Sequence, residues 1–183
     1  MIIAITVTGK DRPGIISALS EVLYRVGGNL EDASMTILEG EFAMIFLAAL
    51  PSKSIYSNLG SALANLERRM GLVISLKEIK HRLIRGEKHE PGSTSWVVSV
   101  LGKDRAGIVY RISQLLADYG LNITDLNSKI IGTGHKTAYV LILEVDVPRR
   151  ASKLIKQLKQ KFKALQKKLG VTIAFNPFDS ALF

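Results

Sequence analysis

The chain has 183 residues, of which 47% are hydrophobic and 22% charged, and it contains no cysteine. This composition supports a packed core and excludes wholesale disorder. The absence of cysteine excludes disulfides, thiolate nucleophiles and cysteine metal sites. The longest uncharged apolar run, 42–50, is much shorter than the roughly 20 residues of a membrane span. No basic segment precedes the first apolar strand pattern, so we expect no signal peptide, no membrane contact and a cytoplasmic location.

An internal repeat organises the chain. Residues 98–129 repeat residues 5–36, and 12 of these 32 positions are identical, whereas chance would give about two. The segment between the copies, around 85–93, is polar, contains proline and glycine, and has no periodicity. We therefore predict one domain over 1–85, a linker over 86–93 and a second domain over 94–183.

Hydrophobic periodicity predicts the same elements in each copy. The first copy is expected to form a strand, a helix, a two-stranded hairpin, a second helix and a last strand, over 2–8, 13–26, 30–38, 41–50, 53–70 and 72–84. In the first helix, Asp11 offers a capping oxygen, Pro13 sits in the first turn and Gly27 ends the helix. The second copy repeats the pattern over 94–101, 106–119, 123–131, 138–146, 149–169 and 171–176. This β-α-β-β-α-β order predicts an α+β protein of two ferredoxin-like domains, each an antiparallel sheet with two helices on one face.

The turn between the first strand and the first helix is the candidate binding site. A helix N-terminus offers free N–H groups to a carboxylate, and Gly14 lets a ligand approach the backbone. Arg12 could add a bidentate contact. Asn29, expected beside this loop, could bind an amino or carboxyl group. The same residues also suit a plain turn, with Asp11 as a cap, Gly14 in a tight bend and Arg12 in water.

Two sequence motifs carry a family resemblance. The run GKDRPG (9–14) precedes an amphipathic helix and then GGNLED (27–32), and the second copy has GKDRAG (102–107) and GLNITD (120–125). In these motifs the chain resembles the ACT-domain family, and in its tandem arrangement the glycine cleavage system transcriptional repressors within it. The resemblance implies amino-acid sensing, with the ligand between this loop and a neighbouring ACT unit, and it implies dimers or paired sheets. The ligand-binding candidates are Asp11, Arg12, Pro13, Gly14, Ile15 and Asn29 in the first copy, and Asp104, Arg105, Gly107, Ile108 and Asn122 in the second.

Positive charge gathers in the second helix of the second copy. Residues 149–170 contain nine Lys and Arg residues and no acid, which equals the net charge of +9 of the whole chain. One interpretation is a solvated outer helix face. The other is a patch for an acidic partner or for nucleic acid. Because most of these charges are lysines, the pattern suits diffuse phosphate contacts better than base recognition. The patch residues are Lys153, Lys156, Lys159, Lys163 and Lys167.

The sequence lacks the residue patterns that nucleotide binding, metal binding and enzymatic catalysis require. Ile15 and Ile108 follow a GxxxxG spacing where a nucleotide loop needs Lys and Ser or Thr. The histidines His81, His89 and His135 have no metal-ligand spacing and are interpreted as surface residues, and no nucleophile or acid–base constellation is visible.

We therefore expect a non-enzymatic, amino-acid-sensing regulatory protein without cofactor or metal. It would act as a homodimer on transcription or on amino-acid metabolism, including that of glycine, through a partner protein. The alternative is a nucleic-acid or polyanion-binding protein that uses the basic helix without sequence specificity.

Overall fold

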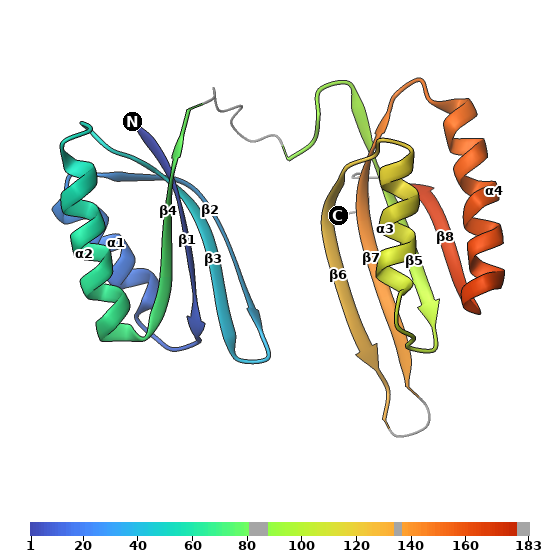
Figure 1. The fold of residues 1–183 in the computed structure, drawn as a ribbon, viewed down its shortest axis with the longest axis horizontal. Helices are drawn as coiled ribbons and strands as arrows, with labels where there is room; N and C mark the ends of the chain where they lie inside the picture. The colour runs from blue at the N-terminus through green and yellow to red at the C-terminus, as the bar shows by residue number, and fades with distance from the viewer. Residues whose placement is uncertain (81–87, 134–136, 179–183) are drawn as a thin grey trace. The chain divides into compact units, whose positions relative to one another are not determined.

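The computed structural model describes residues 1–80, 88–133 and 137–178. These residues form two compact units, one within 1–83 and one within 84–183. Each unit follows the order β-α-β-β-α-β, and both helices of a unit cover the same face of its sheet (Figure 1). The predicted α+β architecture of two ferredoxin-like units is confirmed.

The two units consist of equivalent elements. The first contains β1 (Ile2–Lys10), α1 (Ile15–Arg25), β2 (Asn29–Leu38), β3 (Glu41–Ala49), α2 (Ile55–Met70) and β4 (Leu72–Ile79). The second contains β5 (Ser93–Gly102), α3 (Ile108–Asp118), β6 (Ile123–Ile131), β7 (Ala138–Pro148), α4 (Ser152–Leu169) and β8 (Val171–Pro177). Every strand pairing is antiparallel, in the orders β2-β3-β1-β4 and β6-β7-β5-β8. The strands β2 and β6 are therefore sheet edges.

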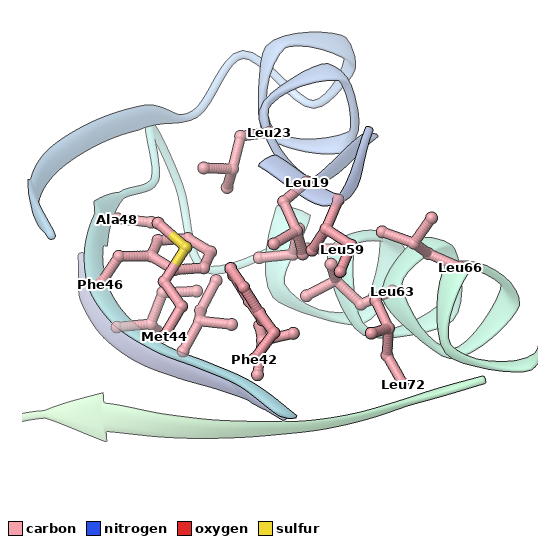
Figure 2. Close-up of a cluster of buried hydrophobic side chains, with 14 of the residues drawn as sticks. Leu19, Leu23, Phe42, Met44, Phe46, Ala48, Leu59, Leu63, Leu66 and Leu72 are labelled. Atoms are coloured by element: carbon pink, nitrogen blue, oxygen red, sulfur yellow. The ribbon is translucent and has the colours of Figure 1, made fainter. Parts of the chain in front are cut away.

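The core of each unit lies between the sheet and its helices. Alternate residues of β1 and β3 point toward the helices, as the period of a strand requires. Leucines of α1 and α2 complete the first core, and Figure 2 shows them converging on Phe42, Met44 and Phe46 of β3. In the second unit, Phe175 lies between Trp96 and Phe162, with ring centroids 4.7 and 5.4 Å away. Buried aromatic and aliphatic side chains thus hold the helices on one face of each sheet.

The first helix of each unit starts later than predicted. α1 begins at Ile15 and α3 at Ile108, each two residues beyond the expected start. The cause is the glycine before each helix, since Gly14 (φ 94°) and Gly107 (φ 92°) have the left-handed conformation and act as N-caps. The predicted capping by Asp11 and placement of Pro13 in the first turn are therefore wrong.

Other boundaries agree within a few residues. The second helices also begin two or three residues late, at Ile55 and Ser152, and both end at a left-handed glycine, Gly71 or Gly170. β4 ends at Ile79, and the part of its predicted extension over 81–84 lies outside the described residues.

Candidate functional site

The loop that follows β1 leaves the first turn of α1 open to solvent. Asp11, Arg12, Pro13 and Gly14 are all exposed, while Ile15 is buried in the core and anchors the helix start. The first helical hydrogen bond runs from the Ala18 N–H to the Gly14 carbonyl, 2.9 Å away. The N–H groups of the preceding helical residues have no intrahelical acceptor. No side chain caps this helix, so these donors are available to a ligand.

The second unit repeats this arrangement at α3. Ile108 is buried, and the Arg111 N–H bonds the Gly107 carbonyl at 3.0 Å, again without a side-chain cap. Apart from their chain neighbours, neither Gly14 nor Gly107 has an atom within 4 Å of the position that a Cβ would take. There is therefore free space beside the backbone at the start of each helix.

Both loop arginines contact the last turn of the second helix in their own unit. Arg12 donates a hydrogen bond to the Met70 carbonyl, and Arg105 donates to the Leu169 carbonyl at 3.3 Å. These carbonyls lie at the negative end of the helix dipole, where a guanidinium is favourable. Each arginine thus ties the loop to α2 or α4, and a role in ligand binding would use the donors that remain.

The structure separates Asn29 from the loop of its own unit. Asn29 pairs with Ala49, which pairs with Ile2, whereas the loop follows Lys10 at the far end of β1. Eight residues of strand separate these rows, or about 26 Å. The expectation that Asn29 lies beside this loop within one repeat is therefore wrong.

Asn122 occupies the equivalent end of the second sheet. Its carbonyl accepts a hydrogen bond from the Asp146 N–H at 3.0 Å, one row from the start of β6. The side chains of Asn29 and Asn122 are exposed, and that of Asn29 donates only a long hydrogen bond, 3.4 Å, to Glu31. Each asparagine can reach a loop only in a neighbouring ACT-like unit.

A polar cluster that sequence reasoning missed anchors residues 88–92 on the second unit. Asp146, only 4% exposed, contacts His89 Nδ1 at 2.7 Å and accepts the Glu90 N–H at 2.9 Å. Of the described residues, it is the only charged one that is buried. His89, expected on the surface, is therefore partnered, and part of the predicted linker is fixed to β7. The other two histidines lie outside the described residues.

Glu144 extends this cluster along β7. It accepts hydrogen bonds from Lys88 at 2.9 Å and from Ser95 at 2.7 Å. Burial opposes its ionisation, but these hydrogen bonds and the charges of Lys88 and His89 hold the pKa of the carboxyl below its usual range. The hydrogen bond to Glu144 in turn raises the pKa of Lys88. The sequence signal for this cluster was two acids within the otherwise apolar run of β7.

The predicted basic patch lies on the outer side of α4. All five of its lysines are exposed, while Leu158, Phe162 and Leu169 on the opposite side are buried. A groove of about 360 Å³ separates α3 from α4, with Arg111, Lys161 and Lys168 among its lining residues.

The described part of the chain holds no group of three or more metal-ligating side chains, and none of its helices is long and apolar enough to cross a membrane.

Three comparisons place the chain among known proteins. Residues 1–77 and 96–163 each match a family profile described as the ACT domain. The chain is 26% identical to the glycine cleavage system transcriptional repressor of Escherichia coli K12, over 95% of this chain and 88% of the repressor. It is 36% identical to a UPF0237 protein of Pyrobaculum aerophilum, over 45% of this chain and 87% of that protein. A crystal structure of an unknown protein from Galdieria sulphuraria matches with a TM-score of 0.75 and 27% identity, over 97% of this chain and 98% of that one.

Proposed function

The chain belongs to the ACT-domain family, and from this premise we propose that it is a non-enzymatic regulatory protein that senses a free amino acid. The observation that supports the proposal is the uncapped helix start after β1, present in both units. A ligand bound there would bias the association of ACT units, and a partner protein would respond to that change.

A free amino acid fits the chemistry of these loops. Its carboxylate would accept the N–H groups at the start of α1, aided by the positive end of the helix dipole. The left-handed Gly14 leaves room for the ligand beside the backbone. The first turn carries no acidic side chain that would compete with the carboxylate.

Because Asn29 lies far from the loop of its own unit, the Asn29 amide at each loop would come from a second copy of the chain. If β2 pairs with β2 of a second copy in antiparallel fashion about its middle, Asn29 of one copy lies opposite Leu38 of the other. Leu38 pairs with Glu41, and Glu41 with Lys10, so this is the sheet end that carries the loop. The join would place Asn29 of one copy at the same end as Gly14 of the other, which a single sheet does not.

The exposed side of β2 supports such a join. Its backbone is unpaired at the sheet edge, and Met35 and Ile37, 44% and 50% exposed, face the side of the sheet that carries the helices. On α1, Ile16 and Tyr24 are exposed as well. An unpaired, apolar edge strand is a site for pairing with another chain. We therefore include a homodimer in the proposal.

The similarity to the Escherichia coli repressor suggests which process this chain regulates. The Escherichia coli protein is named as a transcriptional repressor of the glycine cleavage system. We propose that this chain likewise regulates transcription or amino-acid metabolism in the cytoplasm, with glycine among the candidate ligands. In this proposal, the effect on transcription would pass through a partner protein.

Calorimetry with each of the twenty amino acids tests the proposal. We expect one or a few to bind, and Asn29→Ala to weaken binding about 5- to 150-fold, the cost of one lost hydrogen bond. Ser17→Asp should abolish binding because it places a negative charge at the helix start, where it also favours the helix. Ser61→Asp on the exposed face of α2 is the charge-matched control and should bind normally. Asn122→Ala and Tyr110→Asp test the second unit.

Light scattering tests the dimer. Ile37→Lys together with Ile130→Lys, on the edge strands β2 and β6, should give monomers that no longer bind the amino acid. Binding of none of the twenty amino acids would overturn the sensing function. Full affinity in a monomer would overturn the join but not the sensing.

A further inference from the structure

The helix α4 carries a charge that the fold does not require. Nine of the 25 Lys and Arg residues lie within 149–170, without an acid, so the rest of the chain has 16 residues of each sign. All seven lysines of α4 are exposed, and none forms an ion pair with a carboxylate of the described residues. The whole excess charge of the chain is therefore displayed by one helix and the residues beside it.

The helix α2 provides an internal comparison. It covers the first sheet beside the last strand, as α4 covers the second (Figure 1). Counted back from the glycine that ends each helix, Lys156, Lys161 and Lys163 correspond to the uncharged Ser57, Ala62 and Ala64. In the last turn, by contrast, Lys167 and Lys168 correspond to Arg68 and Arg69. The outer face of a helix in this position thus needs no lysines before its last turn.

One equivalent position shows that an acid has been replaced without loss of its contact. Glu67 of α2 accepts the Ile74 N–H at 2.8 Å, and Gln166 of α4 accepts the Ile173 N–H at 2.9 Å. The hydrogen bond is the same in both units, but in α4 it carries no negative charge. At this position the two helices differ in charge but not in the contact.

The charge also opposes the stability of α4. Arg149, Arg150 and Lys153 lie at the positive end of the helix dipole, and α4 has neither a side-chain cap nor an acid in its first turn. Lysines three or four residues apart repel one another by a few tenths of a kcal/mol per pair. The basic residues before the last turn of α4 therefore cost stability and are absent from the equivalent helix, which indicates a binding role.

Six of the seven lysines of α4 form two rows, and the seventh, Lys159, lies over the Trp96 ring, with its Nζ 5.8 Å from the ring centroid. Lys153, Lys156, Lys163 and Lys167 form an outward row, here termed the α4 ridge, which extends about 21 Å along the helix. Lys161 and Lys168 form a second row on the side toward α3, where Arg111 adds a charge across the groove. The result is a continuous basic surface with one charge about every helical turn.

We propose that this basic surface binds the phosphate backbone of nucleic acid without reading its sequence. A row of lysines that have no carboxylate partner among the described residues suits the row of phosphates along a nucleic-acid strand. A lipid surface fits less well, because the apolar side of α4 is buried in the core and cannot insert. A protein partner fits less well, because protein interfaces are depleted of lysine and use apolar anchors, which the ridge lacks.

The test measures binding of the full chain to a fluorescent duplex of about 30 base pairs, by anisotropy, across a range of salt. If the four ridge lysines and two from the second row each contact a phosphate, the logarithm of the affinity should fall with that of the salt concentration with a slope of about −5. Changing the four ridge lysines to Gln should flatten this slope by about 3.6, or 0.9 for each lost contact. The variant should melt no lower than the wild-type protein.

Two controls keep the test specific. The first changes four exposed lysines off α4 (Lys10, Lys77, Lys80 and Lys129) to Gln, which alters the net charge equally and should leave the slope almost unchanged. The second competes the duplex with polyglutamate and with phosphatidylserine vesicles. The proposal is overturned if the wild type does not bind DNA at low salt, if the control loses as much binding as the ridge variant, or if either competitor binds more tightly than DNA. Amino-acid sensing does not depend on this result.

Discussion

Asp146 offers a direct measure of how firmly residues 88–92 are anchored to the second unit. Its buried carboxylate contacts His89 and accepts the Glu90 N–H. A hydrogen bond to a charged group contributes about 1.5–3 kcal/mol, but Asp146→Ala also removes the cost of burying the carboxylate. Water can replace the contact to His89, which is partly exposed. We therefore expect a net loss of about 2 kcal/mol in the stability of the second unit.

This loss has two readouts in the full chain. For a domain of fewer than 100 residues, 2 kcal/mol corresponds to a fall of about 8–16 °C in melting temperature. Amide exchange should place the change in β5 and β7 and leave the first unit unaffected. Trypsin should also cut faster after Lys88, because the segment that follows is released from β7.

Asp146→Asn separates hydrogen bonding from charge. The Asn amide oxygen can accept the Glu90 N–H, and its NH₂ can donate to the Nδ1 of His89 in the tautomer that has no proton on this nitrogen. We expect a loss of less than about 1 kcal/mol, since both partners remain satisfied. If Asn proves as harmful as Ala, the hydrogen-bond argument is wrong. If neither variant changes the melting or the cleavage, these contacts do not anchor the segment.

Two further predictions concern side chains of single units. Arg12→Ala and Arg105→Ala should each lower the stability of their own unit by about 1 kcal/mol, because a carbonyl in the last turn of α2 or α4 loses its donor. Urea unfolding measures this loss, and a loss of stability in the other unit would contradict the prediction. The lowered pKa of Glu144 means that its ionised form stabilises the second unit above its ordinary pKa of about 4.5, and that this contribution disappears as the pH falls through the lower folded value. The urea midpoint should therefore fall with decreasing pH in this range and fall less in Glu144→Gln; an equal fall in both would refute the assignment.

Much of the fold could be predicted from residue patterns alone. The alternation in β1 and β3 and the leucines of α1 and α2 identify which faces pack together, and the repeat predicts the second unit from the first. The helix starts could not be placed because Pro13 and Asp11 are favourable initial residues, whereas the φ of Gly14 decides where the helix begins. A single sequence does not reveal that a glycine has a left-handed conformation rather than a helical one.

The candidate site was harder to predict because it depends on sheet order. Asn29 follows α1 closely in the chain, which suggests that it returns to the loop where α1 began. In fact α1 carries the chain back along the length of the sheet, so β2 starts at the end opposite to the loop. The cluster around Asp146 was missed for a related reason. The partner of this carboxylate lies 57 residues away, in a segment whose composition resembles a linker.

Comparing the two repeats can show which residues the fold does not require, but it cannot show whether a residue that both repeats share serves the fold or a function. Gly14 and Arg12 recur as Gly107 and Arg105 with the same conformation and the same contact. Such agreement is expected whether the residues bind a ligand or only shape a turn. Only a binding measurement can therefore distinguish the two roles of these loops. A difference between the copies is more informative, because both units have the same fold. Before its last turn, α4 has lysines on its exposed side where α2 is uncharged, and the fold accepts both helices. The requirements of the fold therefore do not explain the lysines before the last turn of α4, and the DNA-binding experiment tests whether these lysines contact phosphates.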